Sequence, residues 1–187
     1  MKKSLGRISK TLLVFGGMII VVIIFVLGMI NRTRKAALPE EPEPEPEPIY
    51  EIVIGDIKFK LHEVKDRGNI LKFSESKYPE RQRPDLTTTE RFIEVTVAVE
   101  NIGKDNTKKD YWDIKELVDS EERKFYSLPE AEPWIPAESE CGAILKPGFS
   151  PTLCTKIYEV AKISSGLKLG VYSREKKKQT FFIDLGI

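Results

Sequence analysis

The chain has little of the residue types that most often carry chemistry. It contains one histidine and two cysteines in 187 residues, too few soft ligands for a zinc site built from protein side chains alone. No Ser-His-Asp arrangement stands out. Thirty lysines and arginines stand against 29 aspartates and glutamates, so the formal net charge is only +1. We therefore expect no cofactor, no bound metal and no nucleic-acid partner.

Long apolar runs are absent outside one segment near the N-terminus. Residues 11–30 read TLLVFGGMIIVVIIFVLGMI and contain neither a charged residue nor a proline. A helix of that length spans roughly 30 Å, which is the thickness of a bilayer's hydrocarbon core. We therefore predict one transmembrane helix over residues 11–30, through which the chain would bind the membrane.

A cleaved signal peptide is the alternative interpretation of this segment. Signal peptides usually have an apolar region of about 7–15 residues, followed directly by a small-x-small cleavage site. Here the basic segment 31–35 follows instead, which favours an uncleaved anchor, although Ala36 and Ala37 leave cleavage open. No cysteine stands where a bacterial lipoprotein would need one.

The orientation of the predicted helix follows from its flanking charges. Four basic residues precede it and three follow it, a small positive-inside excess on the N-terminal side. We expect residues 1–10 to form a cytoplasmic tail. The C-terminal part of this single-pass membrane protein would then lie outside the cytoplasm.

Residues 31–48 are expected to form a stiff linker rich in proline and glutamate. Glu-Pro repeats fill residues 41–48, and each proline fixes its own φ and disfavours helix at the residue before it. Because the glutamates also repel one another, we expect a polyproline II rod of about 25 Å over the repeats. A PxxP ligand for a recognition domain is the alternative, but the flanking arginine that such ligands often use is missing.

Residues 49–187 carry the pattern of a single all-β domain. In FIEVTVAVE (92–100) apolar side chains occupy every second position, the period of a half-buried strand. The polar stretch 74–89 is interpreted as a surface loop. Strands at short, regular spacing without an amphipathic helix indicate a sandwich or a barrel. Similar patterns predict further strands over residues 57–64, 112–118, 124–127, 141–145, 153–160, 167–171 and 181–185.

The strands and turns of this domain resemble a known family. The order FIEVTVAVENIGK, DIKELVDSEERKFY, ILKPGFSPTLCTKIYEV, LKLGVYS and FFIDLG is similar to the bacterial immunoglobulin-like group typified by small secreted immunogenic antigens. The resemblance rests on turn residues such as Asn101, Asp119 and Pro147, and it includes no catalytic residue. The resemblance implies an immunoglobulin-like antiparallel β-sandwich and a place outside the cytoplasm, and it leaves the function open.

Cys141 and Cys154 are the best-defined candidate pair. If residues 141–145 and 153–160 form a hairpin around Pro147-Gly148, the two cysteines lie opposite each other. In an oxidising compartment we expect a structural disulfide between them, and two buried free thiols are the alternative. A CxxC motif is absent, which argues against catalysis by thiol exchange.

Trp134 is the candidate interaction residue. It stands between Pro133 and the pair Ile135-Pro136, and a rigid tryptophan suits an interaction hot spot. The alternative is a tryptophan folded back over the edge of the sandwich. The other candidates have simpler interpretations. We expect His62 to face solvent and the carboxylates of Glu130, Glu132, Glu138 and Glu140 to form a solvated surface. Asp105-Asn106 lacks the spacing of a calcium loop, and Lys176, Lys177 and Lys178 form the solvated tip of a hairpin.

These features favour a non-enzymatic binding or structural module, anchored in the membrane and facing the bacterial cell envelope. Its partner would be a protein or an envelope polymer, and the sequence does not indicate its oligomeric state. Two alternatives stay open. One is an envelope hydrolase built on a β-sandwich, which would need titratable groups converging in a pocket. The other is a small accessory subunit of a membrane complex, in which the helix makes the contact.

Overall fold

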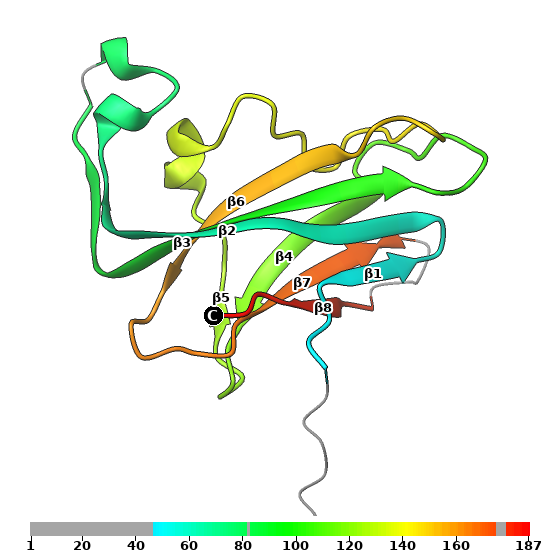
Figure 1. Cartoon of the computed structure of the whole chain (residues 1–187). Helices are drawn as coiled ribbons and strands as arrows, with labels where there is room; N and C mark the ends of the chain where they lie inside the picture. Colours follow the sequence, from blue (N-terminus) through cyan, green and yellow to red (C-terminus); the bar gives the residue numbers. More distant parts are fainter. Residues whose placement is uncertain (1–46, 82, 175–178) are drawn as a thin grey trace, which may run out of the picture. The chain divides into compact units, whose positions relative to one another are not determined.

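The computed structural model describes residues 47–81, 83–174 and 179–187 (Figure 1). The predicted cytoplasmic tail, transmembrane helix and most of the linker lie outside the described residues. Within the described ranges, no helix has the length and apolarity needed to cross a membrane.

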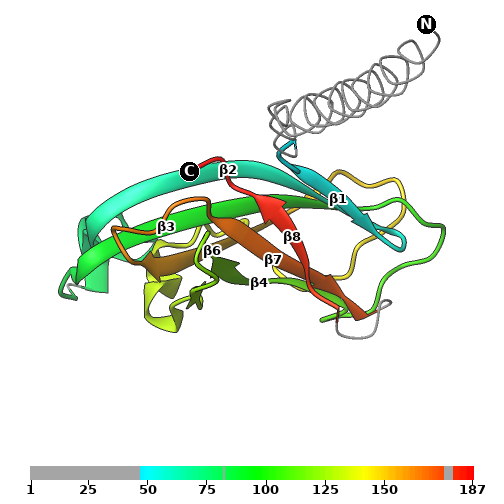
Figure 2. The ribbon, with the colours of Figure 1, turned by 90° about the horizontal axis from the view of Figure 1, so that it is seen from below.

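The described residues form two four-stranded antiparallel sheets, which confirms the expected all-β, sandwich-like fold (Figures 1 and 2). All pairings between neighbouring strands are antiparallel. The first sheet has the order β1 (Glu51–Ile54), β2 (Ile57–Leu71), β3 (Leu86–Asn101) and β6 (Thr152–Val160). The second has the order β5 (Lys124–Phe125), β4 (Trp112–Val118), β7 (Lys168–Ser173) and β8 (Phe181–Asp184).

The main core lies between the two sheets. Alternate side chains of β3 point into it, as the period of two in the sequence predicts, and each of them is fully buried. The second sheet contributes Trp112 from β4, which packs edge-to-face against Phe59 of β2 with ring centroids 6.1 Å apart. The four core residues of β3 are Ile93, Val95, Val97 and Val99.

The hairpin of β2 and β3 is longer than the sequence predicts. Both strands extend to an arm whose tip contains two short 3-10 helices, η1 (Phe73–Glu75) and η2 (Pro79–Arg81) (Figure 1). The predicted surface loop 74–89 is therefore a loop only up to residue 85. Register shifts in β2 between Leu61 and Ile70 break the alternation of side chains, so the extension has no simple period in the sequence.

The predicted strand over residues 141–145 is wrong. Gly142 has φ of 71°, a left-handed conformation that interrupts an extended strand, and the N–H of Leu145 donates to Thr107 Oγ1 instead of to a strand. After the 3-10 helix η3 (Pro129–Trp134), this part of the chain crosses beside β6 without regular structure. The strand β1 has only four residues and carries no recognisable pattern.

Candidate binding surface

Three connections meet at one end of the sandwich, which we call the loop end. They are the β1–β2 turn, residues 102–111 between β3 and β4, and residues 142–151 before β6 (Figures 1 and 2). The N–H of Ile102 donates to the carbonyl of Asp56 at 2.9 Å, which joins the first two connections. The N–H of Thr107 donates to the carbonyl of Leu145 at 3.0 Å, which joins the second to the third.

Asn101, the last residue of β3, holds these connections together. Its side chain is 3% exposed, and its amide nitrogen donates to the carbonyls of Asp105 (2.8 Å) and Leu145 (3.1 Å). Its amide oxygen accepts from the N–H of Gly103 at 2.9 Å. A Cβ atom at Gly103 would lie 2.6 Å from a carboxylate oxygen of Asp56, so only glycine fits this turn. The loop end is therefore tied by buried hydrogen bonds.

The predicted disulfide between Cys141 and Cys154 is present. It forms without the predicted hairpin, because an irregular segment brings Cys141 beside β6: the N–H of Glu140 donates to the carbonyl of Leu153 at 2.8 Å. The indole N–H of Trp112 donates to the carbonyl of Ala143 at 2.9 Å and fixes the same segment to β4. Asp113 lies near both sulfur atoms, but sulfurs bonded to each other are not thiolate ligands for a metal.

Large apolar side chains stand exposed on the loop end. Ile102 is 51% exposed, Ile144 52% and Phe149 61%. The ammonium of Lys146 lies 5.1 Å from the centroid of the Phe149 ring, a cation–π contact that holds the ring beside the turn. Exposed apolar groups on a fixed scaffold, with polar groups around them, are typical of interaction surfaces.

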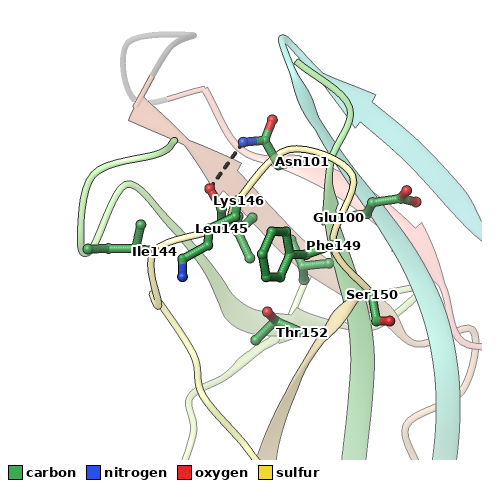
Figure 3. A pocket seen from close by; sticks show the side chains of 9 residues that line it. Glu100, Asn101, Ile144, Leu145, Lys146, Phe149, Ser150 and Thr152 are labelled. Carbon is green, nitrogen blue, oxygen red and sulfur yellow. Dashed lines mark hydrogen bonds between the residues drawn. The ribbon is translucent and has the colours of Figure 1, made fainter. Parts of the chain in front are cut away.

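Two neighbouring pockets open at the loop end. The first, of about 160 Å³, lies between the end of β3, the start of β6 and the turn that carries Phe149 (Figure 3). Apolar groups of Val99, Leu145 and Phe149 line it, with Glu100 and Lys146 among its polar residues. The second, of about 250 Å³, has a mixed lining in which Asp105, Asn106 and Lys108 stand beside Ile57 and Tyr111. Asn101 lines both pockets, so the two are adjacent.

A smaller share of the cations forms ion pairs with carboxylates at the loop end than elsewhere on the domain. Lys58, Lys65 and Lys168, for example, each pair with a carboxylate. Within the described chain, five cations at the loop end form no ion pair: Lys104, Lys108, Lys109, Lys146 and, at the start of the β7–β8 connection, Arg174. Three carboxylates there likewise form none: Glu100, Asp105 and Asp110.

Trp134, the predicted interaction residue, is buried at 8% exposure rather than displayed as a knob. It belongs to a second apolar cluster beside the arm, where its ring meets Phe73 edge-to-face with centroids 5.7 Å apart. Its indole N–H donates to the carbonyl of Lys72 at 2.7 Å. The structure thus has the alternative arrangement, a tryptophan folded back onto the sandwich.

The remaining candidates do not assemble into a site. His62 is exposed on β2, as expected for a solvent-facing residue. Glu130, Glu132, Glu138 and Glu140 are all exposed, as expected for a solvated surface, and Glu132 pairs with Lys77 of the arm. Lys176, Lys177 and Lys178 lie outside the described residues.

The titratable groups whose pKa is strongly shifted have structural roles. Burial, with the charges of Asp113 and Glu116, raises the pKa of Tyr158 well above its usual value, and its hydroxyl donates to the carbonyl of Lys115 at 2.6 Å. That bond links β6 to β4 across the core. At the opposite end of the sandwich, Asp119 organises the turn between β4 and β5 through hydrogen bonds to Arg123 and Ser164.

Sequence reasoning placed Asn101 at a turn but missed its role as the link between connections. The Asn-Ile-Gly order signals a turn, whereas the partner carbonyl of Leu145 lies 44 residues further along the chain. Phe149 was missed because a lone aromatic residue in a Pro-Gly turn has the same pattern whether it is buried or exposed. An apolar residue directly after Pro147-Gly148 was the one available signal.

Comparison with known proteins shows the fold and nothing of the function. The sequence matches no protein-family model and no curated protein. It is similar in structure to a conserved hypothetical protein from Bacillus anthracis, with a TM-score of 0.50 and 17% identity over 72% of this chain and 91% of that one. The yjhA protein from Bacillus subtilis gives a TM-score of 0.47 and 15% identity, over 72% of this chain and 95% of that one. At this identity the first likeness supports a shared β-rich fold.

Proposed function

We propose that this protein is a membrane-anchored, extracytoplasmic binding module of the bacterial cell envelope, without enzymatic activity, which binds its partner through the loop end. One observation carries the proposal: Ile102, Ile144 and Phe149 are exposed on connections held by buried hydrogen bonds and a disulfide. Rigid scaffolds of this kind present loops for recognition. The disulfide is consistent with an oxidising compartment outside the cytoplasm.

We infer further that the sandwich is immunoglobulin-like. In that correspondence β2, β3 and β6 take the places of strands A, B and E, and β5, β4, β7 and β8 those of C′, C, F and G. Trp112 would be the buried tryptophan of strand C, and β1 an addition before strand A. The loop end would then contain the B–C connection, at the end where antibody domains bind. The cysteine pair departs from the B–F disulfide of antibodies, because Cys141 precedes β6.

The anchor rests on the sequence of residues 11–30 and on the Glu-Pro linker that follows. An apolar run of 20 residues suits a bilayer, and a polyproline rod would hold a binding domain clear of the surface. In the accessory-subunit alternative the helix would make the contact, and the loop end would have no partner.

A binding role fits the domain better than the alternative of a hydrolase. Small-molecule sites usually occupy about 300–1,000 Å³, and the pockets at the loop end measure about 160 and 250 Å³. Hydrolysis by paired carboxylates needs two of them fixed in a cleft at a set separation. The candidate carboxylates Glu130, Glu132, Glu138 and Glu140 are instead exposed on the surface, and Glu132 pairs with Lys77.

Two measurements on cells that express the full chain test the proposal. Protease added to intact cells or spheroplasts should remove the β-domain, and a fully protected domain would reverse the orientation. A photo-cross-linking amino acid at Phe149 should give a discrete cross-linked product in the envelope, whereas the same group at Ile163, 77% exposed in the β6–β7 connection, should not. Equal labelling at both positions, or none at Phe149, would refute binding through the loop end.

A further inference from the structure

We propose that the partner at the loop end is a protein segment that inserts one apolar side chain beside Phe149 and places a carboxylate against Lys146. This inference rests on the proposed function and specifies the chemistry of its partner. The first argument is size. A pocket of about 160 Å³ is too small for most small-molecule ligands and suits a single side chain.

The second argument is the arrangement of the two pockets. Both pockets have mixed linings. In the first, Val99, Leu145 and Phe149 stand beside Glu100 and Lys146. In the second, Ile57 and Tyr111 stand beside Asp105 and Lys108. Because Asn101 borders both, an extended peptide that crosses the loop end would pass both pockets, and in each it would meet apolar side chains together with polar partners. Anchoring one apolar residue in a fitted pocket while neighbouring residues make polar contacts is a common mode of peptide recognition.

The third argument is charge. Five cations around the loop end, Lys146 among them, form no ion pair with a described residue. The carboxylates there are Asp56, Glu100, Asp105 and Asp110, of which Glu100 lines the same pocket as Lys146. The ammonium of Lys146 lies over the Phe149 ring, and both residues line the first pocket. An acidic residue beside the apolar anchor would therefore gain an opposite charge at short range, and binding would weaken as salt is added.

The pocket is also pre-formed. The carbonyl of Leu145 accepts from Asn101 Nδ2 (Figure 3). It also accepts from the N–H of Thr107, and the N–H of Leu145 donates to Thr107 Oγ1 at 2.8 Å. Both backbone groups of the residue that forms one wall are thus fixed before any partner arrives. A site fixed in this way loses little entropy on binding.

The test uses the full chain in nanodiscs, panned against a display library of random 12-residue peptides with empty nanodiscs as counter-selection. We expect enrichment of peptides that combine a large apolar residue with a neighbouring aspartate or glutamate. Affinity should fall roughly 30-fold for Phe149→Ser, as for other interface hot spots. It should fall about tenfold for Lys146→Glu, which reverses a charge at the rim.

Matched controls are available at the other end of the sandwich. Ile163→Ser removes an apolar side chain that is more exposed than Phe149. Lys162→Glu reverses a cation that also has no ion pair with a described residue. Both should leave the affinity of the enriched peptides unchanged. Peptides that bind equally well to the Phe149 and Ile163 variants would overturn the proposal.

A lipid surface is the competing partner, and a second measurement separates it. The tryptophan of a Phe149→Trp variant reports whether the loop end enters a lipid surface. If its fluorescence emission shifts to the blue with anionic but not with neutral nanodiscs, and no peptide is enriched, the proposal is overturned in favour of lipid. If no peptide is enriched while Phe149 still gives its cross-linked product in cells, the binding function stands and the peptide chemistry is wrong. If both fail, the proposed function fails as well.

Discussion

The side-chain amide of Asn101 donates a hydrogen bond to the backbone carbonyl of Leu145, and this single contact joins the end of β3 to the loop before β6. The same nitrogen also donates to the carbonyl of Asp105. Two connections that are far apart in sequence thus share one buried side chain as a hydrogen-bond partner, beside the direct bonds between Thr107 and Leu145.

Asn101→Ala should destabilise the domain by about 1–3 kcal/mol, because two carbonyls and one N–H lose a partner in a buried place. Urea unfolding gives the value. Asn69→Ala, at an exposed position on β2, is the matched control and should change the free energy of unfolding by less than about 0.5 kcal/mol. Equal effects of the two variants would show that Asn101 does not hold the loop end.

The disulfide should be present in protein purified from the oxidising side of the membrane. Non-reducing digestion and mass spectrometry should find one peptide containing both Cys141 and Cys154. A Cys141→Ser/Cys154→Ser variant should lose about 2–3 kcal/mol, in the chain-entropy estimate for a short closed loop, and still fold because the sandwich has its own core. Two alkylatable thiols in that protein would contradict the pairing.

How far the sequence predicts this fold depends on where side chains alternate without interruption. The core strand β3 follows a period of two and is predicted. The strand β4 is predicted with its observed ends, although a register shift between Ile114 and Leu117 interrupts its alternation. The arm was missed because bulges in β2 shift the alternation. The sequence of residues 141–145 predicts a strand, but Gly142 turns the chain. The backbone groups of this segment then form hydrogen bonds with residues 107 and 110 instead of with a neighbouring strand.

The candidate site was harder to predict than the fold, for a physical reason. The exposure of Phe149 and the burial of Trp134 depend on which segments pack over them. Phe149 follows a Pro-Gly turn and Trp134 ends the proline-rich 3-10 helix η3, and neither segment has a periodic pattern. The cysteine pair was predicted correctly even though the hairpin was wrong. Its formation needs only that the chain return to β6 after the turn, and a regular ladder is unnecessary.

Trp134 should behave as a core residue of the second cluster. Trp134→Ala should cost about 3–5 kcal/mol, the usual range for a buried tryptophan. Trp134→Phe should cost less, because it keeps the aromatic contact with Phe73 and loses only volume and the bond to Lys72. Tyr126→Ala, at an exposed aromatic residue, is the control. A Trp134→Ala variant as stable as the wild type would restore its interpretation as an interaction residue.

The last prediction concerns pH and rests on Asp119. Burial alone would raise the pKa of its carboxyl, but hydrogen bonds from the Ser164 hydroxyl, the Arg123 side chain and two backbone N–H groups outweigh burial and lower the pKa from 3.8 to about 2. The charged groups around it are Arg123 itself and Glu121, which also pairs with Arg123.

Because the folded state lowers this pKa, the unfolded state binds the proton more tightly. The stabilisation from Asp119 is therefore complete above about pH 5, declines as the pH falls through the unfolded value near 4, and is lost below about pH 2. Urea unfolding of the wild type and of Asp119→Asn at pH 6, 4 and 3 measures it. The difference in unfolding free energy between the wild type and Asp119→Asn should be largest at pH 6 and should narrow toward pH 3. The control is Asp85→Asn, because the carboxylate of Asp85 accepts a hydrogen bond from one backbone N–H on the arm. Its difference from the wild type should change much less with pH. A gap that stays constant from pH 6 to pH 3 would mean that the carboxylate of Asp119 gains nothing from its turn.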